Sequence, residues 1–146
     1  MAAVLAYSYN WQPVLDRSHA LLVGAWVDVW VTLISFVLAC ILGIAIALLR
    51  VSGLRVFRWP AFVYVQLIRG VPLLVFLYWV YFGVAVIVGV NFTATQAAII
   101  ALTVTGSAYT AEIFRAGIGG VDAGNVEAAT ALGFTRRAAF RHVVFP

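Results

Sequence analysis

Between Leu21 and Leu49 the chain carries one charged side chain, Asp28, and this long apolar run limits what the chain can fold into. A membrane-spanning helix needs about 20 predominantly apolar residues, so the run is long enough to cross a bilayer. The whole chain is 65% hydrophobic and 10% charged, and its mean hydropathy is +1.08. A soluble protein of this composition would expose large apolar patches. The sequence therefore predicts a membrane protein.

The apolar segments recur along the chain and predict an all-α, polytopic fold. After an outer lead over residues 1–20, whose aromatic rings prefer the headgroup region, we expect three transmembrane helices, over 21–49, 73–90 and 95–114. Gly24 and Gly43 in the first span allow a neighbouring helix to approach closely. The lipid bilayer is thus the first partner that the sequence predicts.

The segment 54–69 mixes arginines with large aromatic residues. We expect a helix that lies on the inner membrane surface, with its basic heads in water and its rings in the interface. The alternative is a longer second span that starts near Pro60 and buries Arg69. That alternative carries a large desolvation cost for the guanidinium group.

The arginines also predict the orientation of the chain. Arg50, Arg55, Arg58 and Arg69 follow the first span without an acidic residue among them, whereas the stretch from Gly83 to Thr95 has no charge. Basic loops stay in the cytoplasm. The N-terminus is therefore expected outside the cell and residues 115–146 in the cytoplasm.

A bend is predicted between the basic segment and the second span. Pro72 disfavours helix at Val71, and Gly70 leaves the backbone free just before it. Arg69 precedes this bend and marks the end of the surface segment. The chain can therefore turn here from the membrane surface into the bilayer.

The C-terminal segment of the chain, residues 121–146, is polar and predicts two short helices. Asn125 can cap the first helix, with Glu127 in its opening turn, and Gly133 can end it in the left-handed conformation. Thr135 can cap the second helix, which carries Phe140, Val143 and Val144 on one side and stops at Pro146. Such a segment belongs in water or against a water-soluble partner.

Seven positions of this segment resemble a known motif, the cytoplasmic loop of permease subunits of binding-protein-dependent ABC importers. They are Glu127, Ala128, Ala129, Gly133, Val143, Phe145 and Pro146. The resemblance implies that the loop docks a cytoplasmic ATPase, with Gly124, Leu132 and Phe140 among its residues. It also implies a bacterial inner-membrane location, a second permease subunit in a homo- or heterodimer, cytoplasmic ABC ATPase subunits and an extracytoplasmic solute-binding protein.

Two other runs resemble the polar amino-acid uptake branch of this family, which includes histidine and glutamine permeases. Residues 69–74, Arg-Gly-Val-Pro-Leu-Leu, have Val71 where the branch usually has Thr. Residues 111–118 resemble an Ala-Glu-Ile-x-Arg-Gly-Gly-Ile run, with Ala116 in place of the first Gly. Nothing in the residues separates a basic from an acidic or amide amino acid as substrate.

Polar residues in the third span are candidates for the translocation path. Thr103 and Ser107 share a face with Ala111, and Glu112 lies three residues before Arg115, where one helix face can hold both as an ion pair. The alternative role for the hydroxyls is bundle packing, and for the ion pair an anchor at the helix end. We expect Gly117, Gly119 and Gly120 to form a flexible entry into the polar loop.

The sequence contains no catalytic set. It lacks a Gly-rich phosphate loop with Lys and Ser/Thr, so ATP hydrolysis is expected from a partner subunit, and we expect no bound cofactor. One cysteine, Cys40, excludes a multi-cysteine metal site, and His19 and His142 are predicted on opposite sides of the membrane. The arginines flank apolar spans and form no basic stripe, which argues against nucleic-acid binding.

Two functions from different classes stay open. The first is a subunit of an ATP-driven amino-acid importer. The second is a non-transporting membrane interaction or assembly protein, or an inactive permease fragment. Permeases of this family usually continue past the motif proline with two further spans, so we expect a truncated gene or a partial sequence.

Overall fold

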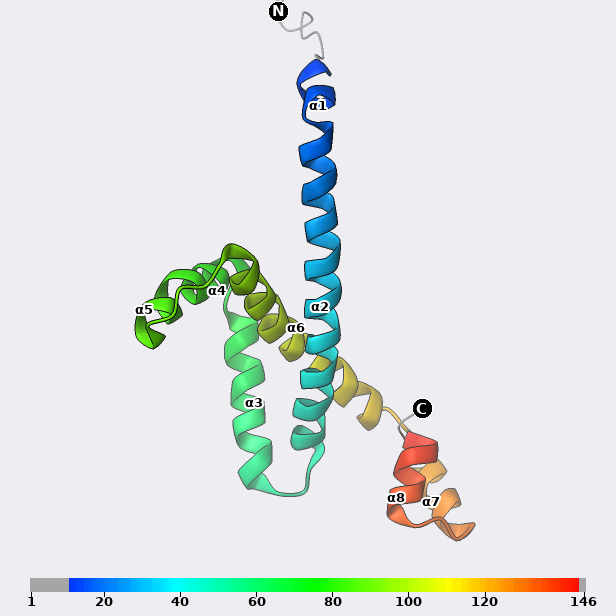
Figure 1. The fold of residues 1–146 in the computed structure, drawn as a ribbon. Coiled ribbons are helices and arrows are strands. Elements are labelled where there is room, and N and C mark those ends of the chain that lie inside the picture. Colours follow the sequence, from blue (N-terminus) through cyan, green and yellow to red (C-terminus); the bar gives the residue numbers. More distant parts are fainter. Residues whose placement is uncertain (1–10, 145–146) are drawn as a thin grey trace, which may run out of the picture.

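The computed structural model describes residues 11–144, all of them in helices or the turns between them (Figure 1). This confirms the all-α fold class. In chain order the elements are α1 (Gln12–Asp16), α2 (Ser18–Val51), α3 (Arg55–Gly70), α4 (Leu73–Tyr78), the π-helix η1 (Trp79–Val84), α5 (Ala85–Val88), α6 (Ala94–Gly119), α7 (Ala123–Ala131), α8 (Arg136–Ala139) and the π-helix η2 (Phe140–Val144).

Two helices, α2 and α6, are each long and apolar enough to cross a membrane. The predicted first and third spans fall inside them. α6 continues to Gly119, so Gly117 and Gly119 belong to the helix and the predicted flexible entry was wrong for them. Glycine weakens a helix interior without forbidding it, and the helix ends at Gly119 with Gly120 as its C-cap.

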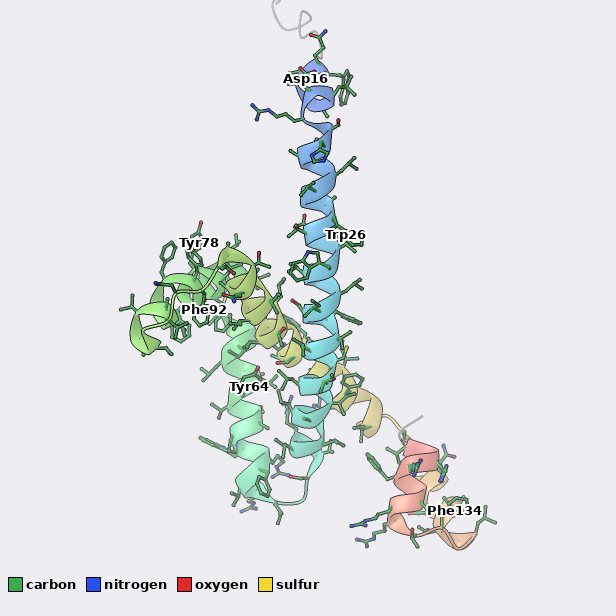
Figure 2. The ribbon with its side chains drawn as sticks, in the orientation of Figure 1. Asp16, Trp26, Tyr64, Tyr78, Phe92 and Phe134 are labelled. Atoms are coloured by element: carbon green, nitrogen blue, oxygen red, sulfur yellow. The ribbon has the colours of Figure 1, made fainter. Side chains whose placement is uncertain are left out.

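Helix α2 is longer than a bilayer core requires. At about 1.5 Å per residue, its 34 residues extend roughly 51 Å, against about 30 Å of hydrocarbon. Its N-terminal part and α1 stand clear of the other helices (Figure 1), and Trp26 on this part is 70% exposed (Figure 2). Half of the predicted outer lead, residues 1–10, lies outside the described residues.

Helices α2 and α6 pack through small side chains. The buried residues of α2 recur at every fourth position: Val31, Ser35, Ala39, Gly43 and Ala47. A Cβ atom built on Gly43 would lie 2.0 Å from Thr110 Oγ1, and one on Gly106 would lie 2.9 Å from the Ala39 Cβ. The two helices therefore approach closely at these glycines, as predicted for Gly43. Gly24 has nothing within 4 Å in the described part of the chain, so no helix of this chain approaches it there.

Hydroxyl groups join the packed helices. Thr110 Oγ1 on α6 donates to the carbonyl oxygen of Ala39 on α2, at 2.9 Å. Tyr64 on α3 (labelled in Figure 2) shares a hydrogen bond of 2.8 Å with Ser107 Oγ and lies 3.2 Å from the Val104 carbonyl oxygen. In lipid, where apolar burial gives little drive for helix association, such contacts and close packing hold helices together.

The segment predicted as a surface helix, residues 54–69, is helical over nearly the same range. α3 runs antiparallel beside the second half of α2 and packs against both α2 and α6, with Ala61 and Val65 buried (Figure 1). An interfacial helix would lie across the end of a spanning helix. α3 instead lies along α2, and the placement of this segment relative to the membrane stays a prediction.

The predicted bend at Gly70–Pro72 is confirmed. Val71 is extended, with φ −99° and ψ 127°, and the axes before and after it differ by 103°. The predicted second span then runs through α4, η1 and α5 as one helix and ends where Gly89 adopts a φ of +71°. Residues Arg55–Gly70 and Leu73–Val88 have the apolar character of one span only when taken together, as a broken span or a re-entrant loop.

We predict that Gly43→Leu destabilises the protein by roughly 1–3 kcal/mol, because the added side chain overlaps Thr110 and pushes α2 away from α6. Gly24→Leu is the matched control, since open space surrounds that position. Thermal unfolding of both purified variants in detergent, followed by circular dichroism, compares them. Equal melting temperatures would contradict the close α2–α6 contact.

Candidate functional site

The polar C-terminal segment forms a short helical hairpin, α7 followed by α8 and η2, at the end of α6 and away from the other helices (Figure 1). Its first helix starts earlier than predicted. Asp122 Oδ1 accepts a hydrogen bond of 2.7 Å from Gly124 N, so Asp122 and not Asn125 is the cap. The carboxylate lies one residue ahead of Ala123, where the first orphan N–H groups are, and Asn125 falls inside the first turn.

The turn of the hairpin is built as predicted from Gly133 and Thr135. Gly133 has φ +86°, its N–H donates to Thr130 O, and Phe134 N donates to Ala129 O, both at 3.0 Å. This pair of backbone hydrogen bonds is a Schellman motif, which satisfies the last carbonyl groups of a helix. Thr135 Oγ1 accepts from Ala138 N at 3.3 Å and caps α8. Backbone hydrogen bonds therefore hold the first end of the turn, and the Thr135 side chain holds the second.

The residues predicted for docking divide into two groups. Gly124, Glu127, Ala128 and Leu132 are exposed, and Leu132 is 79% exposed. Ala129 is 6% exposed and Ala139 of α8 is 1% exposed, because the two arms of the hairpin pack there. Ala129 thus packs inside the hairpin, whereas the motif had led us to expect it among the residues that dock the ATPase. Phe140 is half-buried, and Pro146 lies outside the described residues.

Phe134 is a residue that the sequence analysis missed. It is 41% exposed at the hairpin turn (Figure 2), and its ring lies edge-on to His142, with 6.3 Å between ring centroids. The signal for it was an aromatic residue directly after the helix-ending Gly133, where a hydrophobic contact often accompanies the Schellman motif.

The predicted ion pair in α6 is present. Arg115 donates to Glu112 Oε1 from Nε at 3.0 Å and from Nη2 at 2.6 Å. The sequence analysis missed the second partner, Arg50 at the end of α2, whose Nη1 donates to Glu112 Oε2. Arg50 also lies over the Phe62 ring, 5.5 Å from its centroid. The Glu112 carboxylate therefore joins α2 to α6. Its single negative charge offsets one of the two positive charges of Arg50 and Arg115.

The other candidate path residues have separate environments. Ser107 is buried and takes part in the hydrogen bonds with Tyr64 and Val104, which favours the packing role. Thr103 is 7% exposed, and its hydroxyl has no hydrogen-bond partner within the described part of the chain. Arg69 lies over the ring of Tyr109, 5.3 Å from its centroid, so it is paired with α6 at the bend. Gly70 and Pro72 serve the bend itself.

Among residues 11–144 no group of three or more His, Cys, Asp or Glu side chains lies close enough to hold a metal ion. His19 in α2 and His142 in η2 belong to different ends of the molecule. The arrangement of polar groups thus consists of an exposed hairpin, an ion cluster between α2 and α6, and isolated hydroxyls in the bundle.

Comparison with known proteins gives a consistent result. Residues 39–146 match the family described as binding-protein-dependent transport system inner membrane component. The chain is 34% identical over 140 residues to the probable amino-acid ABC transporter permease protein YckA of Bacillus subtilis, covering 96% of this chain and 62% of that protein. It is 39% identical over 113 residues to the arginine transport system permease protein ArtQ of the same organism, covering 77% and 52%.

Two solved structures are also similar. One is a crystal structure of an amino acid ABC transporter with histidines, with a TM-score of 0.86 and 34% identity over 95% of this chain and 64% of that one. The other is the MetNI methionine ABC transporter in inward-facing conformations, with a TM-score of 0.74 and 25% identity over 90% and 63%. The chain spans less than two thirds of the length of each of these proteins. It belongs to the family of inner membrane components of binding-protein-dependent transport systems.

Proposed function

We propose that this chain is the membrane-spanning part of an ATP-driven importer of amino acids and that the hairpin of α7, α8 and η2 docks the ATPase that drives it. The single observation that carries the proposal is the exposed, polar hairpin attached directly to an apolar spanning helix, in a chain similar to an amino-acid permease over 96% of its length. The identity of the amino acid stays open.

The hairpin is built as a rigid unit that can transmit motion. Asp122 and Thr135 cap its helices, and the Schellman turn at Gly133 fixes the angle between them. A partner that moves the exposed side, at Glu127 or Leu132, would therefore move the hairpin as a unit. α6 leads from the hairpin into the apolar bundle as one helix of 26 residues. Motion received at the hairpin would pass along α6 to the helices packed on it.

The energy for transport comes, in this proposal, from ATP hydrolysis on a separate subunit. The N-terminus lies outside the cell, and a second permease subunit and an extracytoplasmic binding protein complete the importer. Among the candidate path residues, Thr103 is the one whose buried hydroxyl has no hydrogen-bond partner within residues 11–144, and we assign it to the translocation path. Both oxygens of Glu112 are already bonded to arginines, so we assign that ion cluster a structural role.

We predict that Glu127→Arg weakens association with the partner ATPase subunit at least tenfold, because a like charge facing a basic group on the partner costs several kcal/mol. Arg and Glu have similar helix propensities, so α7 should stay folded. Co-purification of the permease with candidate ATPase subunits from membranes measures the effect.

Asp16→Arg is the control, since it makes the same change of charge on an exposed residue at the other end of the molecule. Its co-purification with the ATPase should match that of the unchanged chain. Equal association for Glu127→Arg would remove the docking role of Glu127 and would favour a membrane protein that interacts without coupling to an ATPase.

A further inference from the structure

We propose that the end of the bundle formed by α2, α3 and α6 binds the phosphate headgroup of an anionic phospholipid in the cytoplasmic leaflet. The site is a cavity of about 310 Å³ lined by Arg50, Arg58, Trp59, Phe62 and Arg115. The assignment of the leaflet, though not the site itself, depends on the orientation proposed above. We call these five residues the basic pocket.

The basic pocket has an excess of positive charge. Among residues 11–144, Glu112 is the one acidic side chain bonded to it, and it is shared between Arg50 and Arg115. Arg58 has no acidic partner in the described part of the chain. Three guanidinium groups therefore face one carboxylate, and two positive charges are left without a counter-charge. Basic pockets between membrane helices on the cytoplasmic side bind anionic headgroups for this reason.

The first turn of α3 adds to this potential. The turn contains Arg55 and Arg58 and no acidic residue, and no side chain caps the N-terminal N–H groups. A helix N-terminus favours negative charge and disfavours arginines, so α3 by itself places cations where the helix dipole repels them. An anion bound beside Arg58 would relieve this repulsion.

Parts of the pocket are already ordered for a ligand. The Arg50 side chain is 11% exposed and is held by Glu112 and by the face of Phe62. Arg115 is held by two hydrogen bonds to the same carboxylate. Guanidinium groups that are fixed in advance lose little conformational entropy when they bind a phosphate. Arg58 is exposed and is the side chain free to close on the ligand.

The surroundings favour a lipid over a soluble phosphate. Trp59 is 71% exposed, and nearby on the same helix start Leu54 and Val56 are 62% and 78% exposed. Large apolar side chains directly beside arginines suit the boundary between acyl chains and headgroups, where Trp is enriched. A phospholipid can place its phosphate among the arginines and its chains against the apolar residues. A free phosphate has no acyl chains that could contact these apolar residues.

Native mass spectrometry of the purified full chain in detergent tests the site with phosphatidylglycerol, and phosphatidylcholine serves as the neutral comparison. We expect a saturable one-to-one complex with phosphatidylglycerol only. Arg58→Gln should weaken it about fivefold, the effect of one arginine near a membrane surface. Arg55→Gln is the matched control, because it removes the same charge from the same turn outside the pocket, and binding should change little.

Three results would overturn the proposal. They are no preference for phosphatidylglycerol, an equal loss in both variants, and displacement of the lipid by millimolar glycerol 3-phosphate, which would identify a site for soluble phosphates. Binding in detergent does not depend on the direction in which the chain crosses a membrane or on an ATPase. Failure here would therefore leave the proposed transport function untouched, and failure of that function would leave this result standing.

Discussion

The close packing of α2 against α6 at glycine, alanine and threonine positions is the interaction on which the rest of the structure depends. Gly43 faces Thr110, Gly106 faces Ala39, and the Thr110 hydroxyl donates across to the Ala39 carbonyl oxygen. Lipid chains are as apolar as leucine, so two membrane helices gain little from apolar burial and need close packing and hydrogen bonds instead. α3 adds to this pair through Tyr64 and Ser107. The exposed hairpin follows the C-terminal end of α6, one member of the pair.

An ion cluster around Glu112 adds a further link between α2 and α6. Buried ionic groups are expensive in a membrane, and they persist where partners surround them. Glu112 meets that condition with Arg115 on its own helix and Arg50 on α2. The cluster therefore fixes the ends of α2 and α6 against each other, while the glycine contacts fix their middle. Because two arginines share one carboxylate, this end also keeps a positive charge, in agreement with the predicted cytoplasmic side.

Features that depend on neighbours in the chain could be predicted from the sequence. These local features include the two long spans, the bend at Gly70–Pro72, the left-handed Gly133, the Thr135 cap and the Glu112–Arg115 pair.

Contacts between distant segments could not be predicted from the sequence. Arg50 and Glu112 lie 62 positions apart, and the direction of α3 follows from its packing on two other helices. Ala129 and Ala128 look alike in sequence, and only the folded hairpin decides which one is covered. Asp and Asn are both favoured at the N-cap, and in the structure the helix begins after the earlier residue, Asp122, and not after Asn125.

The account requires the hairpin and the outer turn after α5 to lie on opposite sides of the membrane. Labelling in intact cells tests this most directly, because Cys40 is the only cysteine and Cys40→Ala gives a cysteine-free background. In it, Asn91→Cys and Leu132→Cys each place one thiol at an exposed position. We expect a membrane-impermeant maleimide to label Cys at position 91 in intact cells and Cys at position 132 only after permeabilisation. Labelling of position 132 from outside would contradict the central claim.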